Sequence, residues 1–186
     1  MIVRNTRGVD MSGPDVVTRA LKIARQHIDM AAGDVDRNPS DAAKLAGNYT
    51  KGHLVWRGLD ITLENPKGSA RSGVDPKGKP WKVQMPAHYG YIKRSTGADG
   101  DHVDIYMGPH PLSHLVFVVD QVDHKSQRFD EHKVMLGFDN AASAIDTYEK
   151  AFSDGKGHAR IGGVMQMTVD QFKKWLKSGD TTKRLT

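Results

Sequence analysis

The 186-residue chain contains no cysteine, which excludes disulfides and thiolate metal sites. Aromatic residues make up only 7% of the chain and the arginines are dispersed, so a nucleic-acid-binding surface has little support. No apolar run approaches the roughly 20 residues that span a membrane, and the N-terminal residues lack the apolar core of a signal peptide. These absences favour a cytoplasmic protein with no membrane partner.

The remaining composition is that of an ordinary globular chain with an excess of positive charge. Hydrophobic residues make up 38% of the sequence, enough for one core of moderate size. The net charge of +5 suits a polyanionic partner, either nucleic acid or a small phosphate compound. Charge alone does not choose between these two classes.

The first 47 residues are predicted to form a helical N-terminal extension. Apolar residues recur at helical spacing over residues 14–32, and residues 41–46 are expected to form a second, short helical piece. The recurring positions are Val17, Ala20, Leu21, Ala24 and Ile28. An amphipathic helix of this kind packs on the domain or on a partner.

From residue 48 to residue 186 the pattern changes to short strands followed by late helices. Strands are expected at residues 54–56, 60–64, 81–85, 103–107, 115–119 and 132–136. Helices are expected at residues 140–152 and 168–178, the second with Thr168 and Gln171 in a capping box. The sequence therefore predicts an α+β domain, and many short strands separated by Gly and Pro turns favour a small barrel.

Three carboxylates are close together around one glycine. Asp99 and Asp101 lie two residues apart, Asp104 follows, and Gly100 allows a tight turn between them. Carboxylates this close attract a hard divalent cation, and Mg²⁺ or Mn²⁺ is the expected ion. A solvated acidic turn is the alternative. An EF-hand is excluded because Asp104 and His110 stand where that loop needs Gly and Glu.

The wider motif resembles the signature region of the soluble inorganic pyrophosphatases. Pro86 precedes the segment Tyr89-Gly90-Tyr91-Ile92, and the Asp-Gly-Asp-His-Val-Asp loop follows after seven residues. His102 stands where that family usually has proline. The resemblance implies a five-stranded, OB-like barrel with flanking helices, and Asp99, Asp101 and Asp104 as metal ligands. It also implies that Asp104 bridges two ions and that Asp101 takes the proton of the attacking water.

Further site residues follow from the same resemblance. Glu131 and its competitor Asp130 match a later pair of metal carboxylates, Asp123 is a third candidate, and Lys133 would meet a phosphate oxygen or a carboxylate. A solvated hairpin is the alternative for these residues.

Upstream, Glu64 resembles the family's strand-end acid that faces the active cavity, and it is expected to join the metal ligands. Arg71, favoured over Lys67, and Tyr89 would bind phosphate oxygens.

Two features of the motif remain open. The late Tyr-Lys pair of the family has several candidates here: Tyr148, Lys150, Lys156 and the pair Phe152-Ser153. His88 and His102 flank the signature and are expected to lie in solvent or behind the ligands. His132 alternates with Glu131 and Lys133 on a predicted strand and should face away from them.

The function that these expectations favour is Mg²⁺-dependent hydrolysis of inorganic pyrophosphate to two phosphates. A metal-dependent hydrolase of another phosphoanhydride, such as a nucleotide, is one alternative, and a noncatalytic phage-particle module is another. The sequence is most similar to the divergent pyrophosphatase-like domains of phage and mobile-element polyvalent proteins. This similarity lies in Gly58-Leu59-Asp60-Ile61, Glu64-Asn65-Pro66-Lys67-Gly68 and the acidic loop. It implies phage structural or DNA-delivery proteins as partners.

Overall fold

The structure is a computed structural model that describes residues 14–75 and 77–186. Its helices are α1 (Pro14–Gly33), α2 (Asp41–Leu45), α3 (Ala141–Lys150) and α4 (Val169–Ser178), with a short 3₁₀ turn η1 at His158–Arg160. Its strands are β1 (Gly52–Trp56), β2 (Leu59–Asn65), β3 (Ala70–Val74), β4 (Pro80–Gln84), β5 (His88–Ile92), β6 (Asp104–Met107), β7 (Leu115–Val122), β8 (Phe129–Leu136) and β9 (Ile161–Thr168). The α+β class and all four predicted helices are confirmed.

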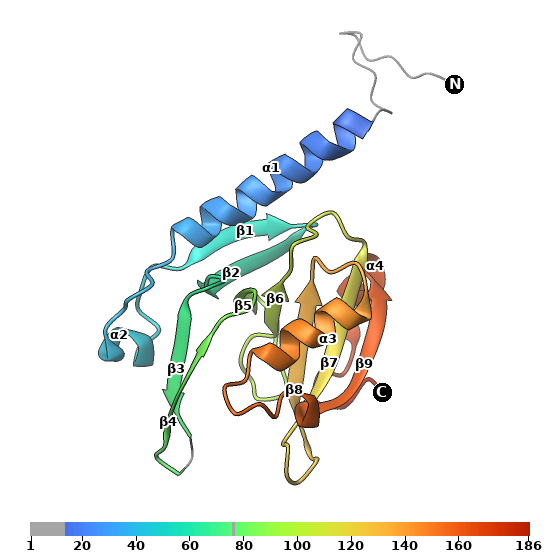
Figure 1. Cartoon of the computed structure of the whole chain (residues 1–186). Coiled ribbons are helices and arrows are strands. Elements are labelled where there is room, and N and C mark those ends of the chain that lie inside the picture. The colour runs from blue at the N-terminus through green and yellow to red at the C-terminus, as the bar shows by residue number, and fades with distance from the viewer. Residues whose placement is uncertain (1–13, 76) are drawn as a thin grey trace.

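One open sheet forms the body of the protein. Seven strands pair in the order β1-β2-β5-β6-β8-β7-β9, and β3 pairs with β4 in a separate hairpin that extends from the sheet (Figure 1). The predicted closed, five-stranded barrel is wrong, because within the described residues β1 and β9 end the sheet without pairing with each other. Closure would require those two strands to bond. Instead β1 packs against α1, and β9 leads directly into α4.

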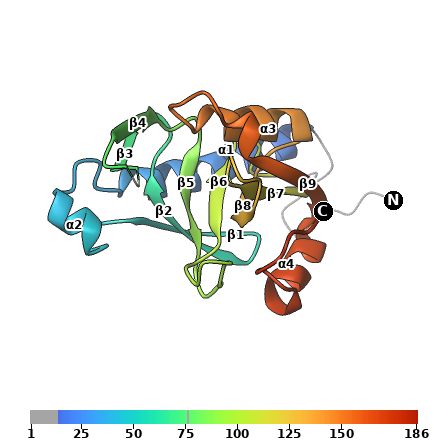
Figure 2. The same cartoon turned by 90° about the horizontal axis from the view of Figure 1, so that it is seen from below.

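Helices cover both faces of the sheet. One face is apolar and packs against α1 and α4, whose Ile28 and Phe172 join the same buried cluster. The other face packs against α3 through Ala144 and Tyr148. Figure 2 shows α3 and α4 on opposite sides of the strands β7, β8 and β9. A residue on these strands therefore faces either the α3 side or the α4 side, according to its place in the strand alternation.

The N-terminal helix packs on the sheet by its C-terminal half. Ile28, Ala31 and Ala32 are buried, and a Cβ on Gly52 of β1 would lie 1.9 Å from the carbonyl oxygen of Ala31. Val17, nearer the start of α1, is 64% exposed, and the helix extends past the sheet there (Figure 1). The domain boundary at residue 47 stays a prediction.

Across residues 14–75 and 77–186 no helix, α1 included, is long and apolar enough to cross a bilayer.

The buried side chain of Asp120 fastens the end of the chain to the α4 side of the sheet. The carboxylate of Asp120 lies 3.0 Å from the imidazole of His132, and both side chains are 0% exposed. Asp120 also accepts hydrogen bonds from the backbone N–H groups of Leu185 and Thr186 and from the Thr186 hydroxyl. His132 faces away from Glu131 and Lys133, as its position in the strand predicts.

Replacing Asp120 is expected to destabilise the fold strongly. Asp120→Ala leaves the backbone N–H groups of Leu185 and Thr186 and the Thr186 hydroxyl without their acceptor, and each buried donor left unpaired costs about 1–3 kcal/mol. Urea unfolding followed by circular dichroism measures the loss. Asp146→Ala, which removes only an exposed pair with Lys150, is the control and should change little. Equal stability of the two variants would contradict this account.

Candidate active site

Strand register brings three motif residues to the α3 face of the sheet. Asp104 of β6 lies opposite Tyr91 of antiparallel β5 and opposite Lys133 of parallel β8. Tyr89 lies two residues before Tyr91 and therefore shares its face. The strand pairing therefore brings Lys133 to Asp104, 29 positions away in the sequence, and to Tyr89, 44 positions away.

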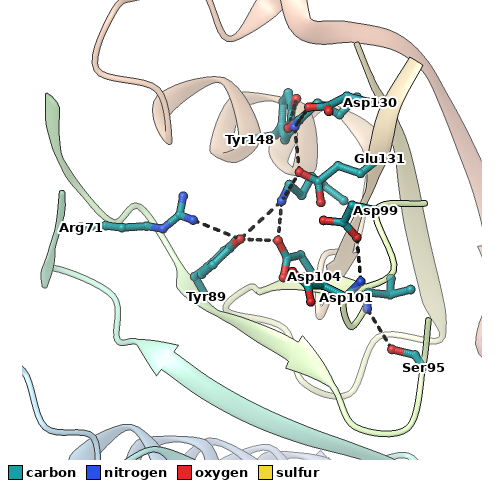
Figure 3. A network of polar contacts seen from close by, with 12 residues as sticks. Arg71, Tyr89, Ser95, Asp99, Asp101, Asp104, Asp130, Glu131 and Tyr148 are labelled. Carbon is teal, nitrogen blue, oxygen red and sulfur yellow. Dashed lines mark hydrogen bonds and ion pairs between the residues drawn. The ribbon is translucent and has the colours of Figure 1, made fainter. Parts of the chain in front are cut away.

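The side chains of Tyr89, Asp104 and Lys133 form one contact cluster. Figure 3 shows Tyr89 and Asp104 in contact. The ammonium group of Lys133 and the hydroxyl of Tyr89 both donate to Oδ2 of Asp104. Lys133 Nζ also lies 2.9 Å from Oε1 of Glu131 and 3.4 Å from the Tyr89 hydroxyl. A single buried cation therefore joins two carboxylates and a phenol.

Arg71 joins this cluster from the β3–β4 hairpin. Its Nη2 lies 3.5 Å from the Tyr89 hydroxyl, and its guanidinium carbon lies 4.5 Å from the centre of the Tyr89 ring. The centre of the Trp81 ring lies 5.6 Å from the same guanidinium carbon. Two aromatic rings thus hold a planar cation beside the phenol, an arrangement that suits an anionic ligand with several oxygens.

The buried setting shifts the pKa values of these groups. Burial raises the pKa of the Tyr89 phenol, and Lys133 only partly offsets that effect. Burial acts to lower the pKa of Lys133, but Tyr89, Asp104 and Glu131 outweigh it and raise that pKa well above the ordinary value. Burial likewise raises the pKa of the Glu131 carboxyl, against the effect of Lys133. At neutral pH the cluster therefore holds a protonated phenol and a charged ammonium group.

The acidic loop enters the site as a turn. Gly100 has a positive φ of 89°, which confirms the tight turn expected at this glycine. The Asp99 carboxylate accepts a hydrogen bond of 3.0 Å from the backbone N–H of Asp101. This bond folds the segment, so Asp99 and Asp101 do not project from an extended chain. Both residues lie in the loop that leads into β6, whose first residue is Asp104.

A second pair of acids lies next to the cluster. Nε2 of Gln121 lies 2.9 Å from Oδ2 of Asp130 and 3.1 Å from Oε1 of Glu131. Oε1 of Gln121 accepts a hydrogen bond of 2.9 Å from the hydroxyl of Tyr148. This group lies beside the cluster of Tyr89, Asp104 and Lys133, because Glu131 contacts both Gln121 and Lys133 (Figure 3).

Other predicted residues lie outside these contacts. Glu64 pairs with Lys51 at 2.6 Å, and the side chain of Lys67 is exposed. Asp123 accepts hydrogen bonds from the backbone N–H groups of its own turn, which lower the pKa of its carboxyl to about 2. These contacts bind Asp123 to a surface turn and favour Asp130 as the partner of Glu131.

The flanking histidines have local partners. His88 accepts a hydrogen bond of 3.2 Å from the backbone N–H of Lys67. His102 stacks on Tyr91 with ring centres 4.9 Å apart, and its Nδ1 lies 2.8 Å from the Ser95 carbonyl oxygen. Neither contact involves a carboxylate.

Sequence reasoning missed Gln121 and left Tyr148 as one of several candidates. Gln121 had no motif to mark it, and the predicted strand ended at residue 119. The available signal was its position two residues after Val119, on the strand face that packs against α3. Tyr148 is fully buried on α3 and its ring packs edge-on against Tyr106.

Comparison with known proteins identifies the family. The family model described as Inorganic Pyrophosphatase matches residues 41–177. The chain belongs to the inorganic pyrophosphatase family. No curated protein matches it.

Several solved structures are also similar to this chain. An inorganic pyrophosphatase of Helicobacter pylori is 18% identical, with 63% of this chain and 88% of that chain covered and a TM-score of 0.39. One from Neisseria gonorrhoeae is 17% identical, covering 67% of this chain and 92% of that chain, with a TM-score of 0.37. A protein of Anaplasma phagocytophilum described as an inorganic phosphatase is 17% identical, covering 70% and 91% respectively, with a TM-score of 0.38.

The donor chemistry of the site fits the magnesium that this family typically uses. The cluster offers carboxylate oxygens, which hard divalent cations prefer. Asp104 and Glu131 already contact one shared positive charge, the ammonium group of Lys133. Among residues 14–75 and 77–186, no group of three or more His, Cys, Asp or Glu side chains is arranged to hold a metal ion. The assignment of Asp99, Asp101, Asp104, Asp130, Glu131 and Glu64 as ligands therefore stays a prediction.

Proposed function

We propose that this chain catalyses the Mg²⁺-dependent hydrolysis of inorganic pyrophosphate to two phosphates. The observation that carries the proposal is the buried cluster of Tyr89, Asp104 and Lys133, within the part of the chain that matches the family. Its residues come from three different strands, so the fold is what brings them together. A solvated hairpin would not need a fully buried cation.

The chain supplies three groups that would bind the phosphates. Arg71 offers a guanidinium held by two rings, Lys133 an ammonium group, and Tyr89 a phenol that stays protonated. Cations and donors of this kind stabilise charge on the phosphoryl oxygens as the bridging bond breaks. Positioning by the β-sheet holds these groups in place before substrate arrives.

The acids would hold the cations and accept the proton. Asp99, Asp101 and Asp104 are the proposed ligands from the loop, and Asp130 and Glu131 the proposed ligands from β8. When bound, Mg²⁺, or Mn²⁺ in its place, supplies charge neutralisation of the substrate and acidifies the water that attacks phosphorus. The exposed carboxylate of Asp101 would accept the proton that this water loses.

Phosphate release from a substrate panel tests the proposal. Purified protein is incubated with pyrophosphate, ATP or a dinucleotide, each with Mg²⁺ or with EDTA. The proposal predicts metal-dependent release from pyrophosphate. Release from nucleotides alone would support a hydrolase of another phosphoanhydride, and no release from any substrate would support a noncatalytic module.

Tyr89→Phe is expected to lower kcat/KM for pyrophosphate about 10- to 100-fold, the effect of one hydrogen bond to a charged group. The substitution removes the hydroxyl that contacts Asp104, Lys133 and Arg71 but keeps the ring. Tyr91→Phe is the matched control from the same motif, because Tyr91 stacks on His102 outside the cluster. Steady-state phosphate release measures both variants. Equal losses in the two would contradict the role given to Tyr89.

The proposed link to phage and mobile-element proteins rests on the sequence resemblance alone. It predicts that the protein is found in the bacterial cytoplasm or with phage structural or DNA-delivery proteins. Mass spectrometry of purified particles and of host lysate tests this prediction.

A further inference from the structure

Gln121 lies where two irregularities meet in the sheet. On the β8 side, Gln121 pairs with Glu131 and Val122 pairs with Phe129, so Asp130 is an extra residue without a partner. On the β9 side, Asp120 pairs with Gly163 and Gln121 with Ile161, which leaves Gly162 unpaired. A bulge turns neighbouring side chains toward the same side of a strand. It explains how the adjacent residues Asp130 and Glu131 both reach Gln121.

The carboxamide of Gln121 uses both of its N–H donors and accepts one hydrogen bond at this site. Its two N–H groups point to two acceptors, Oδ2 of Asp130 at 2.9 Å and Oε1 of Glu131 at 3.1 Å. Its oxygen accepts from Tyr148 at 2.9 Å. Because burial raises the pKa of the Tyr148 phenol, that hydroxyl keeps its proton and remains a donor. Tyr148 thereby fixes which end of the carboxamide faces the acids.

The contacts leave one oxygen on each acid for another ligand. Gln121 contacts Oδ2 of Asp130, and both Gln121 and Lys133 contact Oε1 of Glu131. Oδ1 of Asp130 and Oε2 of Glu131 have no contact of this kind within the described part of the chain. Gln121 is itself only 8% exposed, so solvent does not compete for its amide.

We infer that Gln121 is a positioning residue that holds the carboxylates of Asp130 and Glu131 side by side as a cation-binding pair. The inference rests on the proposed function, because it takes these two acids as ligands of the same magnesium-dependent site. Gln121 does not contact the substrate in this account. It acts through the two acids, as residues behind metal ligands commonly do.

Metal binding without substrate tests the inference. Gln121→Met keeps the length of the side chain and removes the carboxamide, and Tyr148→Phe keeps Gln121 but removes the hydroxyl that orients it. Titration calorimetry with Mg²⁺ and electron paramagnetic resonance with Mn²⁺ measure affinity. We expect a loss of about 10- to 100-fold for Gln121→Met and a smaller loss for Tyr148→Phe. Gln166→Met, an exposed glutamine on β9, should bind like the unaltered chain.

The outcomes separate this inference from the proposed function. Unchanged affinity in folded Gln121→Met protein would overturn the inference, as would an unaltered chain that binds neither ion. If Gln121→Met does not fold, unchanged affinity in Tyr148→Phe would overturn it instead. The inference would be supported and the proposed function refuted by one combination of results. The unaltered chain binds the metal ion, the substitution weakens that binding, and the unaltered chain releases no phosphate from pyrophosphate.

Discussion

Asp104→Asn is expected to lower pyrophosphate turnover by about 10³-fold. Asparagine keeps the shape of the side chain but loses the negative charge that Lys133 and Tyr89 both contact. In the proposed function this charge also holds a cation, so both the electrostatics and the metal site are lost together. Phosphate release at saturating Mg²⁺ measures the effect.

The fold of the Asp104→Asn variant should remain, because the substitution conserves volume and the amide still accepts a hydrogen bond from Lys133. Circular dichroism and thermal unfolding check this. Asp146→Asn, on the exposed face of α3, is the control and should retain full turnover. Retained activity in Asp104→Asn would contradict the assignment of the acidic loop to the site.

Lys133→Met is expected to lower both turnover and stability. The side chain of Lys133 is 8% exposed, while the side chains of Asp104 and Glu131 are 21% and 20% exposed. Removing the ammonium group leaves two adjacent acids without their cation, at a cost of about 3 kcal/mol, the lower end for a buried pair because both carboxylates reach solvent. Turnover should fall by about 10²-fold or more because a donor to the phosphate is lost.

Magnesium should reverse part of the stability loss in Lys133→Met. If Asp104 and Glu131 bind the cation, Mg²⁺ replaces the missing charge and raises the Tm of the variant by more than that of the unaltered chain. Lys150→Met, which breaks only an exposed pair with Asp146, provides the comparison and should show no added response. A Tm of Lys133→Met that does not depend on Mg²⁺ would contradict the metal assignment.

The helices could be predicted from the sequence because their signals are local. The capping box of Thr168 and Gln171 forms as expected, with both reciprocal hydrogen bonds present. The predicted end of the first helix at residue 32 also agrees with α1, which ends at Gly33. Apolar spacing and cap residues are read within one or two turns of chain, so neither needs tertiary context.

The missed strands are rich in glycine and depend on contacts far away in sequence. β5 contains Gly90, where a Cβ would lie 1.9 Å from the carbonyl oxygen of Thr62. β9 contains Gly162 and Gly163, and a Cβ on Gly163 would lie 1.8 Å from the Thr186 hydroxyl. Glycine weakens a strand signal in the sequence, while the folded protein needs it for close approach.

The site residues likewise fall into two groups, those that a local sequence motif marks and those that only tertiary contacts bring in. The acidic loop and Tyr89 were found because their spacing carries a motif, whereas Gln121 joins them only through a bulge in the pairing of β7 with β8. Arg71 reaches Tyr89 from the separate β3–β4 hairpin, a contact that residue spacing does not reveal. Whether the sheet closes into a barrel likewise depends on whether its edge strands, β1 and β9, pair with each other.

Phosphorus NMR of pyrophosphate with purified protein tests the central claim most directly. The account predicts that the pyrophosphate signal is replaced by that of inorganic phosphate in a ratio of one to two when Mg²⁺ is present, and that EDTA stops the conversion. A pyrophosphate signal that persists unchanged with Mg²⁺ and with Mn²⁺, in folded protein, would contradict it.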